Sequence, residues 1–208
     1  MKVAIVVSHP NQESLTWSVC EAFQRGVENA AGNVEFDILD LYADKFSPEF
    51  QKCDLEFLAM QRELEPQIIE YQQRIDAADA LVVVTPIYWW SLPAMLKGFF
   101  DRVFTPGWAY DVVDGGTSAS LADRPALILA LGATDAEAYD RHGYEKSFKT
   151  QIEYGIFSYC GIKSAKTEVF FSVIDKEFGG VDPEVHLERA ANIGSSFGAE
   201  LTQHVSAA

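Results

Sequence analysis

Three large aromatic residues follow one another in this sequence: Tyr88, Trp89 and Trp90. They come directly after a very apolar run, Ala80–Thr85, and before Ser91–Pro93, which predicts the start of a helix. The rings therefore belong to a loop at the carboxyl end of a strand, where an open parallel sheet binds its ligands. A structural protein would bury such rings, whereas three rings in one loop predict a flat apolar wall for an aromatic cofactor or substrate.

A second candidate site is the segment Val7–Thr16, which joins the first apolar strand to the first amphipathic run. Ser14 is placed to cap the helix that follows, and the free N–H groups of a helix start attract anions. Thr16 offers a further hydroxyl and His9 a ring donor. The segment lacks G-x-G-x-x-G and the P-loop lysine, so the standard dinucleotide and nucleotide fingerprints are absent. Two interpretations of this segment, a plain helix cap and a phosphate site, both stay open at this point.

The elements that must position these loops alternate between strand and helix. The expected strands are Val3–Val7, Asn33–Leu39, Ala80–Thr85, Ala126–Leu131 and Ala165–Val173. The expected helices are Leu15–Val27, Glu63–Ala77, Leu92–Phe104, Glu145–Cys160 and one from Pro183 with Leu187, Ala190, Gly194, Phe197 and Leu201 on one face. Ala43–Glu56 is expected to be a loop that carries a helical turn, and Asp111–Asp123 a surface loop. This alternation predicts a doubly wound α/β domain over residues 1–208, with a five-stranded parallel sheet in the order 2-1-3-4-5.

Composition narrows the function classes. A net charge of −15 argues against nucleic acid, since phosphate contacts need clustered Lys and Arg. No run approaches the roughly 18 apolar residues of a membrane span, and Met1–Val7 is too short for a signal peptide. Cys20, Cys53 and Cys160 form no metal or disulfide pattern, so we expect buried thiols, no metal and a cytoplasmic location. Phe99, Phe100 and Phe104 have helical spacing and are expected in the core or at an interface.

Taken together, the two loops resemble a known family. The segments that carry the resemblance are His9-Pro10, Ser14-Leu15-Thr16, Pro86–Gly98, Asp101–Phe104 and Gly107–Tyr110. They are similar to the NAD(P)H:quinone oxidoreductases, which have a flavodoxin-like fold. The resemblance is strongest over residues 2–17 and 79–111 and weaker from there to about residue 175.

The resemblance implies a tightly bound flavin, FAD or FMN, with the FAD enzymes the nearer match. It places the flavin phosphate at His9, Ser14, Leu15 and Thr16. It places the isoalloxazine ring along Pro86, Ile87, Tyr88, Trp89 and Trp90. The loop after the fourth strand, at the pyrimidine end of the ring, would be Leu131, Gly132, Ala133 and Thr134, which departs from the family's Thr-Thr-Gly-Gly-like run. The catalytic residues near the flavin O2 would be Tyr139 and His142, the latter closer to the tyrosine than in the animal enzymes.

The implied activity is a two-electron hydride transfer from NADH or NADPH, through the flavin, to a quinone or another small planar electrophile. Donor and acceptor would use one apolar slot in turn, in a homodimer with its active site at the interface. Three alternatives stay open: an azo- or nitro-compound reductase, an ancillary regulatory subunit of a potassium efflux system, and a flavodoxin-type electron carrier. Carriers use a Ser/Thr-rich phosphate loop, which Ser8–Thr16 does not match.

Overall fold

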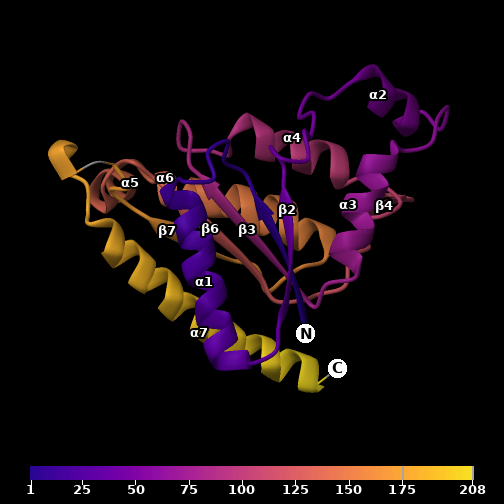
Figure 1. Ribbon diagram of the computed structural model, residues 1–208. Coiled ribbons are helices and arrows are strands. Elements are labelled where there is room, and N and C mark those ends of the chain that lie inside the picture. Colours follow the sequence, from indigo (N-terminus) through magenta and orange to yellow (C-terminus); the bar gives the residue numbers. More distant parts are fainter. Residues whose placement is uncertain (175, 208) are drawn as a thin grey trace.

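A five-stranded parallel sheet forms the centre of the protein (Figure 1). The computed structural model describes residues 1–174 and 176–207. The strands are β1 (Lys2–Val7), β2 (Glu35–Asp40), β3 (Ala80–Pro86), β6 (Ala126–Leu131) and β7 (Lys166–Phe170), in the order β2-β1-β3-β6-β7. All neighbouring pairs are parallel, so the predicted order 2-1-3-4-5 is confirmed when these five strands are counted along the chain. Every residue of β3 and β6 is buried, which explains their continuous apolar sequences.

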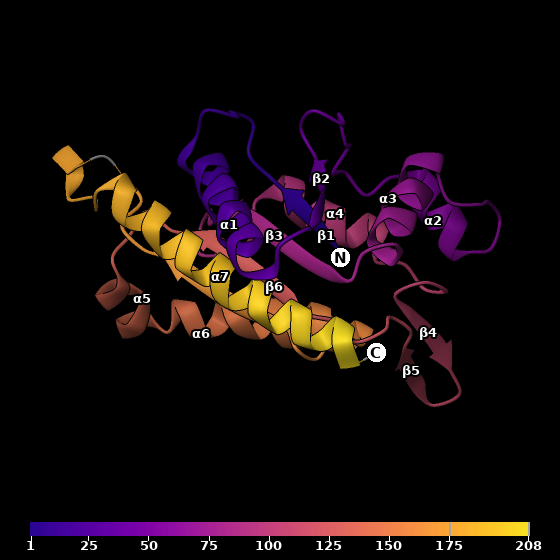
Figure 2. The same cartoon turned by 60° about the horizontal axis from the view of Figure 1, so that its bottom comes forward.

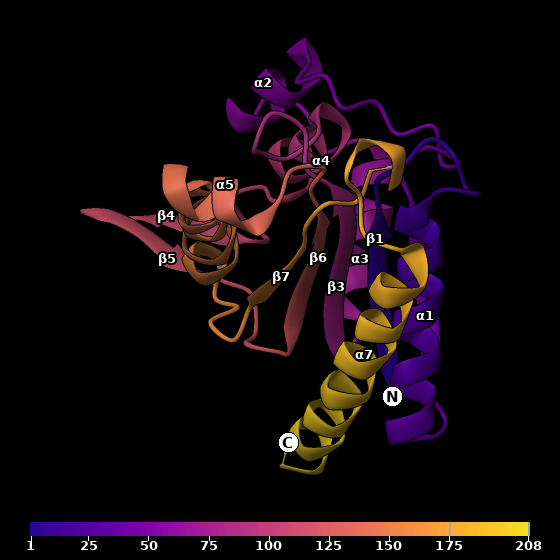
Figure 3. The same cartoon turned by 90° about the vertical axis from the view of Figure 1, so that its left-hand side faces the viewer.

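Helices cover both faces of the sheet (Figure 3). One face packs against α1 (Leu15–Ala31) and α7 (Pro183–Ala207), and the other packs against α3 (Pro66–Asp76), α4 (Ala94–Val103) and the α6–η1 helix. The latter is α6 (Tyr144–Lys149) continued by a π-helix, η1 (Thr150–Ser158). Along β1 the side chains alternate between the two layers, with Val3, Ile5 and Val7 facing α1 and α7.

The α1 and α7 helices cross in close contact, and the crossing depends on glycine. A Cβ atom on Gly26 would lie 2.0 Å from the carbonyl oxygen of Ala191, and one on Gly194 would lie 2.2 Å from that of Phe23. The predicted apolar face of the last helix is confirmed, because Ala190, Gly194, Phe197 and Leu201 are buried in this layer with Leu187 partly buried against it. The contact fixes the position of α1 against α7.

Two segments expected as loops contain regular structure. In the first, the expected helical turn is a short helix, α2 (Lys52–Leu58), and the second is a hairpin of β4 (Tyr110–Val113) and β5 (Gly116–Ala119) that projects from the domain (Figure 2). A short helix, α5 (Ala136–His142), and a 3₁₀ turn, η2 (Lys176–Phe178), also lacked a sequence signal, and the helix expected over 145–160 is divided between α6 and η1. Polar residues dominate these segments, so the segments lack an apolar pattern of their own. Their structure therefore depends on partners elsewhere in the chain.

One such partner is Arg102, which is buried and holds the α2 segment against α4. Its Nε lies 3.0 Å from Oδ2 of Asp54, and one of its terminal nitrogens lies 2.7 Å from Oε2 of Glu65. The other terminal nitrogen donates to the carbonyl oxygen of Ser47 at 2.7 Å. Breaking a buried pair by removing one partner strongly destabilises a protein, so this cluster anchors the residues before α3.

The cysteines and phenylalanines behave largely as the sequence predicts. Cys20 and Cys160 are buried, and burial raises the pKa of their thiols to about 12 and about 11. Both therefore stay protonated and unreactive at neutral pH, while Cys53 is partly exposed. Phe99, Phe100 and Phe104 all lie in the core. Within the described parts of the chain, no helix is both long and apolar enough to span a bilayer.

Candidate functional site

Three loops meet at the carboxyl ends of neighbouring strands. Their backbones are tied together, because Ser8 N–H donates to Val84 O at 3.1 Å and Ile87 N–H donates to Leu131 O at 2.7 Å. The register pairs Val7 with Val84 and Pro86 with Leu131. The three predicted loops, after β1, β3 and β6, therefore lie at one edge of the sheet, in the position where open α/β sheets bind ligands.

The loop after β1 leaves hydroxyl groups without partners. Ser14 occupies the N-cap position of α1 as predicted, but its side chain makes no capping bond. Its Oγ and that of Ser8 are buried and have no hydrogen-bond partner among the described residues. The loop itself is held by other bonds, including Glu13 N–H to Asn11 Oδ1 at 2.9 Å. Such buried orphan groups are rare and costly in proteins, so both hydroxyls are candidates for contact with a ligand.

The other residues expected at the phosphate differ in the groups that they provide for hydrogen bonds. Leu15 and Thr16 open the first turn of α1, where backbone N–H groups have no carbonyl partner within the helix. The His9 ring contacts its own loop, with Nδ1 2.9 Å from the oxygen and 3.1 Å from the nitrogen of Asn11. The loop is therefore a set of uncharged donors at a helix N-terminus, which suits an anion.

The loop after β3 is a strained turn built from two tryptophans. Tyr88 and Ser91 exchange two backbone hydrogen bonds of 3.1 Å, and the central residues Trp89 and Trp90 have φ angles of 50° and 57°. Positive φ at both central positions is the geometry of a type I′ turn, which Asn-Gly normally supplies. Bulky residues in this region cost on the order of 1–3 kcal/mol each, and such strain clusters at functional sites. Trp89 is 87% exposed, which places a large apolar ring in solvent.

A row of aromatic rings connects this turn to the segment after β6. Trp90 stacks on Tyr144 with ring centroids 4.5 Å apart and planes at 27°. The His142 ring lies 5.2 Å from that of Tyr144, and Tyr139 meets it edge-on at 6.1 Å. Tyr144 was not predicted from the sequence. The available signal was the aromatic residue directly after Gly143, whose positive φ of 68° turns the chain between α5 and α6.

The loop after β6 brings Tyr139 close to Gly132. A Cβ atom on Gly132 would lie 2.5 Å from the Tyr139 hydroxyl oxygen, so the hydroxyl lies directly over this glycine. Tyr139 is 2% exposed, and burial raises the pKa of its hydroxyl, which stays a donor at neutral pH. Gly132 N–H already donates to Phe170 O at 2.8 Å. Ala133 and Thr134 are therefore the amides of this loop that remain candidates for a ligand.

The family of the chain follows from comparison with known proteins. A family model described as flavodoxin-like fold matches residues 1–191. The chain belongs to this family. Among its relatives, an uncharacterized NAD(P)H oxidoreductase, YcaK, of Escherichia coli (strain K12) is 32% identical over 79% of this chain and 80% of its own length. Ribosyldihydronicotinamide dehydrogenase (quinone) of Pongo abelii is 27% identical over 82% of this chain and 81% of its own.

A solved structure extends the similarity to three dimensions. The NAD(P)H:quinone oxidoreductase from Methanothermobacter marburgensis superimposes with a TM-score of 0.81 at 27% identity, covering 94% of this chain and 98% of its own. An FMN-dependent NADH-azoreductase from Bacillus anthracis, solved in complex with FMN, shares the fold at 19% identity with a TM-score of 0.76. The resemblance to flavodoxin-like NAD(P)H:quinone oxidoreductases is thereby confirmed.

The residues at the sheet edge fit a flavin in three respects. The orphan hydroxyls of Ser8 and Ser14 at the start of α1 suit a phosphate group. The exposed aromatic turn of Trp89 and Trp90 offers faces for a planar ring system. Gly132 has no side chain between Tyr139 and the loop backbone, so a ring edge could approach both.

Proposed function

We propose that the protein is a flavin-dependent NAD(P)H:quinone oxidoreductase. The observation that carries this proposal is the pairing, at one edge of the sheet, of unpartnered donors after β1 with the strained aromatic turn after β3. An anion site beside an apolar wall matches a cofactor that has a phosphate at one end and a planar ring at the other. The activities by which the relatives are named support the same class.

In this proposal each loop holds one part of the cofactor. His9, the Ser14 hydroxyl and the first-turn amides of Leu15 and Thr16 hold the phosphate. The isoalloxazine ring lies along Pro86, Ile87, Tyr88, Trp89 and Trp90. The pyrimidine end lies against Leu131, Gly132, Ala133 and Thr134. When bound, the flavin supplies the hydride acceptor and donor, and the chain supplies orientation and electrostatics.

Tyr139 has the clearest chemical role among the proposed catalytic residues. Its hydroxyl is buried, protonated and placed over the loop proposed for the pyrimidine edge. A fixed donor stabilises the negative charge that develops at that edge more effectively than water does. The donor is already oriented toward the charge, so no reorganisation energy is needed. His142 is exposed at the end of α5 and contacts Tyr144, so it would act from the open side of the site.

The apolar slot would take the nicotinamide ring of NADH or NADPH and then the quinone. Trp89 and Trp90 would position each ring by stacking, with Tyr144 holding Trp90 in place, so that the binding free energy of the stack offsets the entropy lost when the rings are oriented. A cationic cluster for a 2′-phosphate was not found in the sequence, so the choice between NADH and NADPH is open. Azo and nitro compounds are also planar electrophiles and fit the same slot.

We further propose a homodimer. Leu58, Met60 and Val112 are exposed at 46%, 95% and 76% and line one hollow between the α2 segment and the projecting hairpin. Exposed apolar residues gathered in this way mark interaction surfaces. Light scattering coupled to size-exclusion chromatography should give twice the mass of one chain, and a monomer would contradict the proposal.

Steady-state oxidation of NADH or NADPH with menadione tests the activity. We expect rapid turnover and parallel lines in double-reciprocal plots, because donor and acceptor use one slot in turn. A flavodoxin-type carrier or a purely regulatory subunit would be slow with menadione. Colourless protein that also takes up neither FMN nor FAD would defeat the proposal.

A further inference from the structure

The loop after β6 is held in place by the segment that follows β7. Val173 N–H donates to Gly132 O at 3.2 Å, and Ser172 N–H donates to Thr134 O at 3.0 Å. Because a trans peptide is planar, the bond that fixes Gly132 O also directs the Ala133 N–H away from Val173. The segment after β7 therefore orients an amide that remains a candidate for contact with a ligand.

A bend at Ser172 makes these contacts possible. Ser172 has a φ angle of 57°, and its carbonyl oxygen accepts the N–H of Val181 at 3.0 Å. A residue other than glycine is strained in this left-handed region and persists there only where its surroundings hold it. The bend therefore depends on the side chains that pack against it.

His186, in the first turn of α7, lies against this bend. It is 5% exposed, and its ring lies beside the backbone of Ser172. The ring also meets that of Phe170 edge-on, with centroids 6.0 Å apart. Phe170 O accepts the Gly132 N–H at 2.8 Å. The imidazole thus contacts two of the residues through which the segment after β7 holds the loop after β6.

The surroundings of His186 keep its ring neutral. Burial is the main cause that lowers its pKa below the ordinary value of histidine, and the positive charge of Arg189, one turn further along α7, lowers the pKa again. The ring also lies at the N-terminal end of a helix, where the backbone dipoles disfavour a cation. At neutral pH the side chain is therefore an uncharged ring packed in the fold.

The charged groups on the elements around this ring have partners or lie in solvent. On β7, Glu168 pairs with Arg189 at 2.6 Å, and in the segment after β7, Lys176 pairs with Asp182. Two further acidic residues of α7 are exposed, Glu184 and Glu188. The start of α1 adds uncharged side chains to the same layer, Leu15 and Trp17. Among the described residues, an imidazolium here would meet the like charge of Arg189 and carboxylates that already have partners.

We infer that His186 is a positioning residue for the loop after β6, with its neutral ring seating the Ser172 bend and protonation of that ring releasing it. An imidazolium carries N–H donors on both ring nitrogens, and Nε2 has no acceptor among the described residues. The contact is complete above about pH 6.5 and is lost as the pH falls through the lowered pKa of His186. Its consequence for flavin binding rests on the proposed function, in which this loop meets the pyrimidine edge.

Amide hydrogen exchange, followed by NMR on flavin-free protein, tests the positioning without any cofactor. The amides of Gly132, Ser172 and Val173 report the contact. Those of Ser8 and Leu41, which are also bonded at the carboxyl ends of strands, are internal controls. In the wild-type protein, the protection of the three reporter amides should fall about tenfold between about pH 7.5 and about pH 5, and that of the controls should not.

Three variants separate a local role from a general one. His186→Gln cannot take up a proton, so the protection of the reporter amides should not change with pH. His186→Ala leaves the bend unsupported and should give low protection at both pH values. His204→Gln, at an exposed histidine of the same helix, should behave as the wild-type protein does. An equal loss at the Ser8 and Leu41 amides, or a pH response that survives in His186→Gln, would overturn the inference.

Titration with FMN and with FAD connects the contact to the cofactor. Between about pH 7.5 and about pH 5, flavin affinity should fall about tenfold more in the wild-type protein than in His186→Gln, a comparison that cancels the titration of the flavin phosphate itself. An equal fall in both proteins would overturn the consequence for flavin binding. Failure to bind either flavin at neutral pH would instead refute the proposed function, and the exchange of the reporter amides would still decide the role of His186.

Discussion

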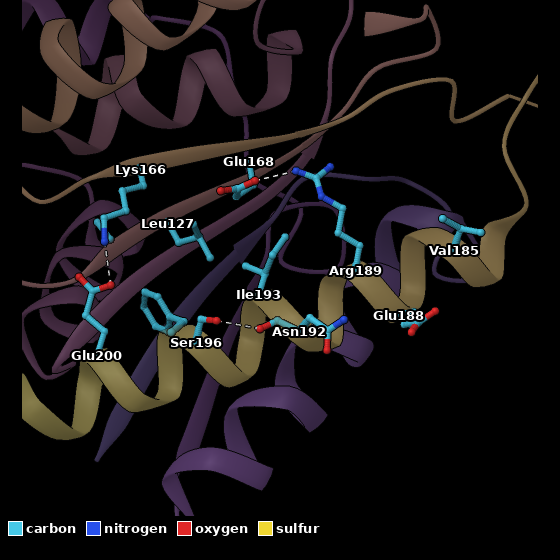
Figure 4. A pocket seen from close by; sticks show the side chains of 12 residues that line it. Leu127, Lys166, Glu168, Val185, Glu188, Arg189, Asn192, Ile193, Ser196 and Glu200 are labelled. Carbon is cyan, nitrogen blue, oxygen red and sulfur yellow. Dashed lines mark hydrogen bonds and ion pairs between the residues drawn. The ribbon is translucent and has the colours of Figure 1, made fainter.

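The candidate site at the carboxyl edge of the sheet and the groove between α7 and β7 differ in how their polar groups are satisfied. The groove, of about 590 Å³, runs beside the edge strand (Figure 4). Its charged side chains pair across it, Lys166 with Glu200 at 2.8 Å and Arg189 with Glu168 at 2.6 Å. At the candidate site, the hydroxyls of Ser8 and Ser14 have no such partners among the described residues.

This difference in hydrogen-bond satisfaction distinguishes a surface hollow from a candidate binding site. Groups that satisfy one another stabilise the fold, and a ligand would have to replace those bonds to enter. Donors without partners, beside a strained turn at Trp89 and Trp90, cost free energy that a ligand can recover. Hollow shape alone would favour the groove over the candidate site at the strand ends, whereas the chemistry favours the candidate site.

The sharpest test of the candidate site is a methyl group on Gly132. The Cβ of Gly132→Ala would lie 2.5 Å from the Tyr139 hydroxyl, and the Tyr139 ring is packed against Phe171 with centroids 5.0 Å apart. Because that ring cannot move aside freely, we expect a loss of about 2–3 kcal/mol in unfolding free energy and at least tenfold weaker flavin binding. Chemical denaturation and flavin titration measure the two effects.

Gly116→Ala is the matched control, because nothing lies within 4 Å of a Cβ atom at that position in the hairpin. It should leave stability and flavin binding unchanged. Full flavin affinity in Gly132→Ala would mean that this loop does not contact the cofactor.

The groove is tested by Arg189→Ala. Arg189 pairs with Glu168, donates to Val169 O at 2.7 Å and lies 4.6 Å from the Phe170 ring centroid. Removing it uncovers an edge of the sheet and leaves Glu168 unpaired, so we expect a loss of about 1–2 kcal/mol, limited by partial solvent exposure. Thermal denaturation measures this loss. Flavin affinity and menadione reduction should not change, and a large fall in either would show that the groove takes part in the function.

Most of the fold was predictable because its signals are local. Continuous apolar runs such as Ala126–Leu131 identify buried parallel strands, and the alternation with helices sets the sheet order. The β4–β5 hairpin, and the full extent of α2 beyond the expected helical turn, were missed for the opposite reason. Arg102 holds α2 from far along the chain, and the hairpin strands are almost wholly exposed, so neither leaves an apolar pattern.

The site was predictable at the level of loops but not of contacts. The sequence identified the loops that meet at the sheet edge, including Ser14 and Trp89. It did not predict that the Ser14 hydroxyl has no partner or that Trp89 and Trp90 adopt positive φ angles. It also did not predict the stacking of Tyr144 on Trp90. These features depend on distances between segments, which residue spacing does not encode.

A smaller effect at the candidate site is expected from Tyr139→Phe, which deletes one buried donor. If that donor stabilises charge at the pyrimidine edge, flavin reduction by NADH or NADPH should slow about tenfold, the equivalent of about 1.4 kcal/mol. Stopped-flow absorbance of the bound flavin measures the step directly. An unchanged rate with flavin still bound would remove Tyr139 from the mechanism and leave the Ala133 and Thr134 amides as candidates.

The smallest effect concerns Tyr144, which supports the strained turn without being expected to touch the reacting atoms. Its stack on Trp90 holds a residue whose backbone conformation is unfavourable, so Tyr144→Leu should release that ring. Aromatic pairs of this kind contribute about 0.5–1.5 kcal/mol, which predicts a roughly threefold to tenfold rise in KM for the quinone with little change in kcat. Tyr144→Phe keeps the ring and should restore the KM of the wild-type protein. Equal defects in the Leu and Phe variants would assign the effect to the hydroxyl, and no defect in either would mean that the turn is held by its own backbone bonds between Tyr88 and Ser91.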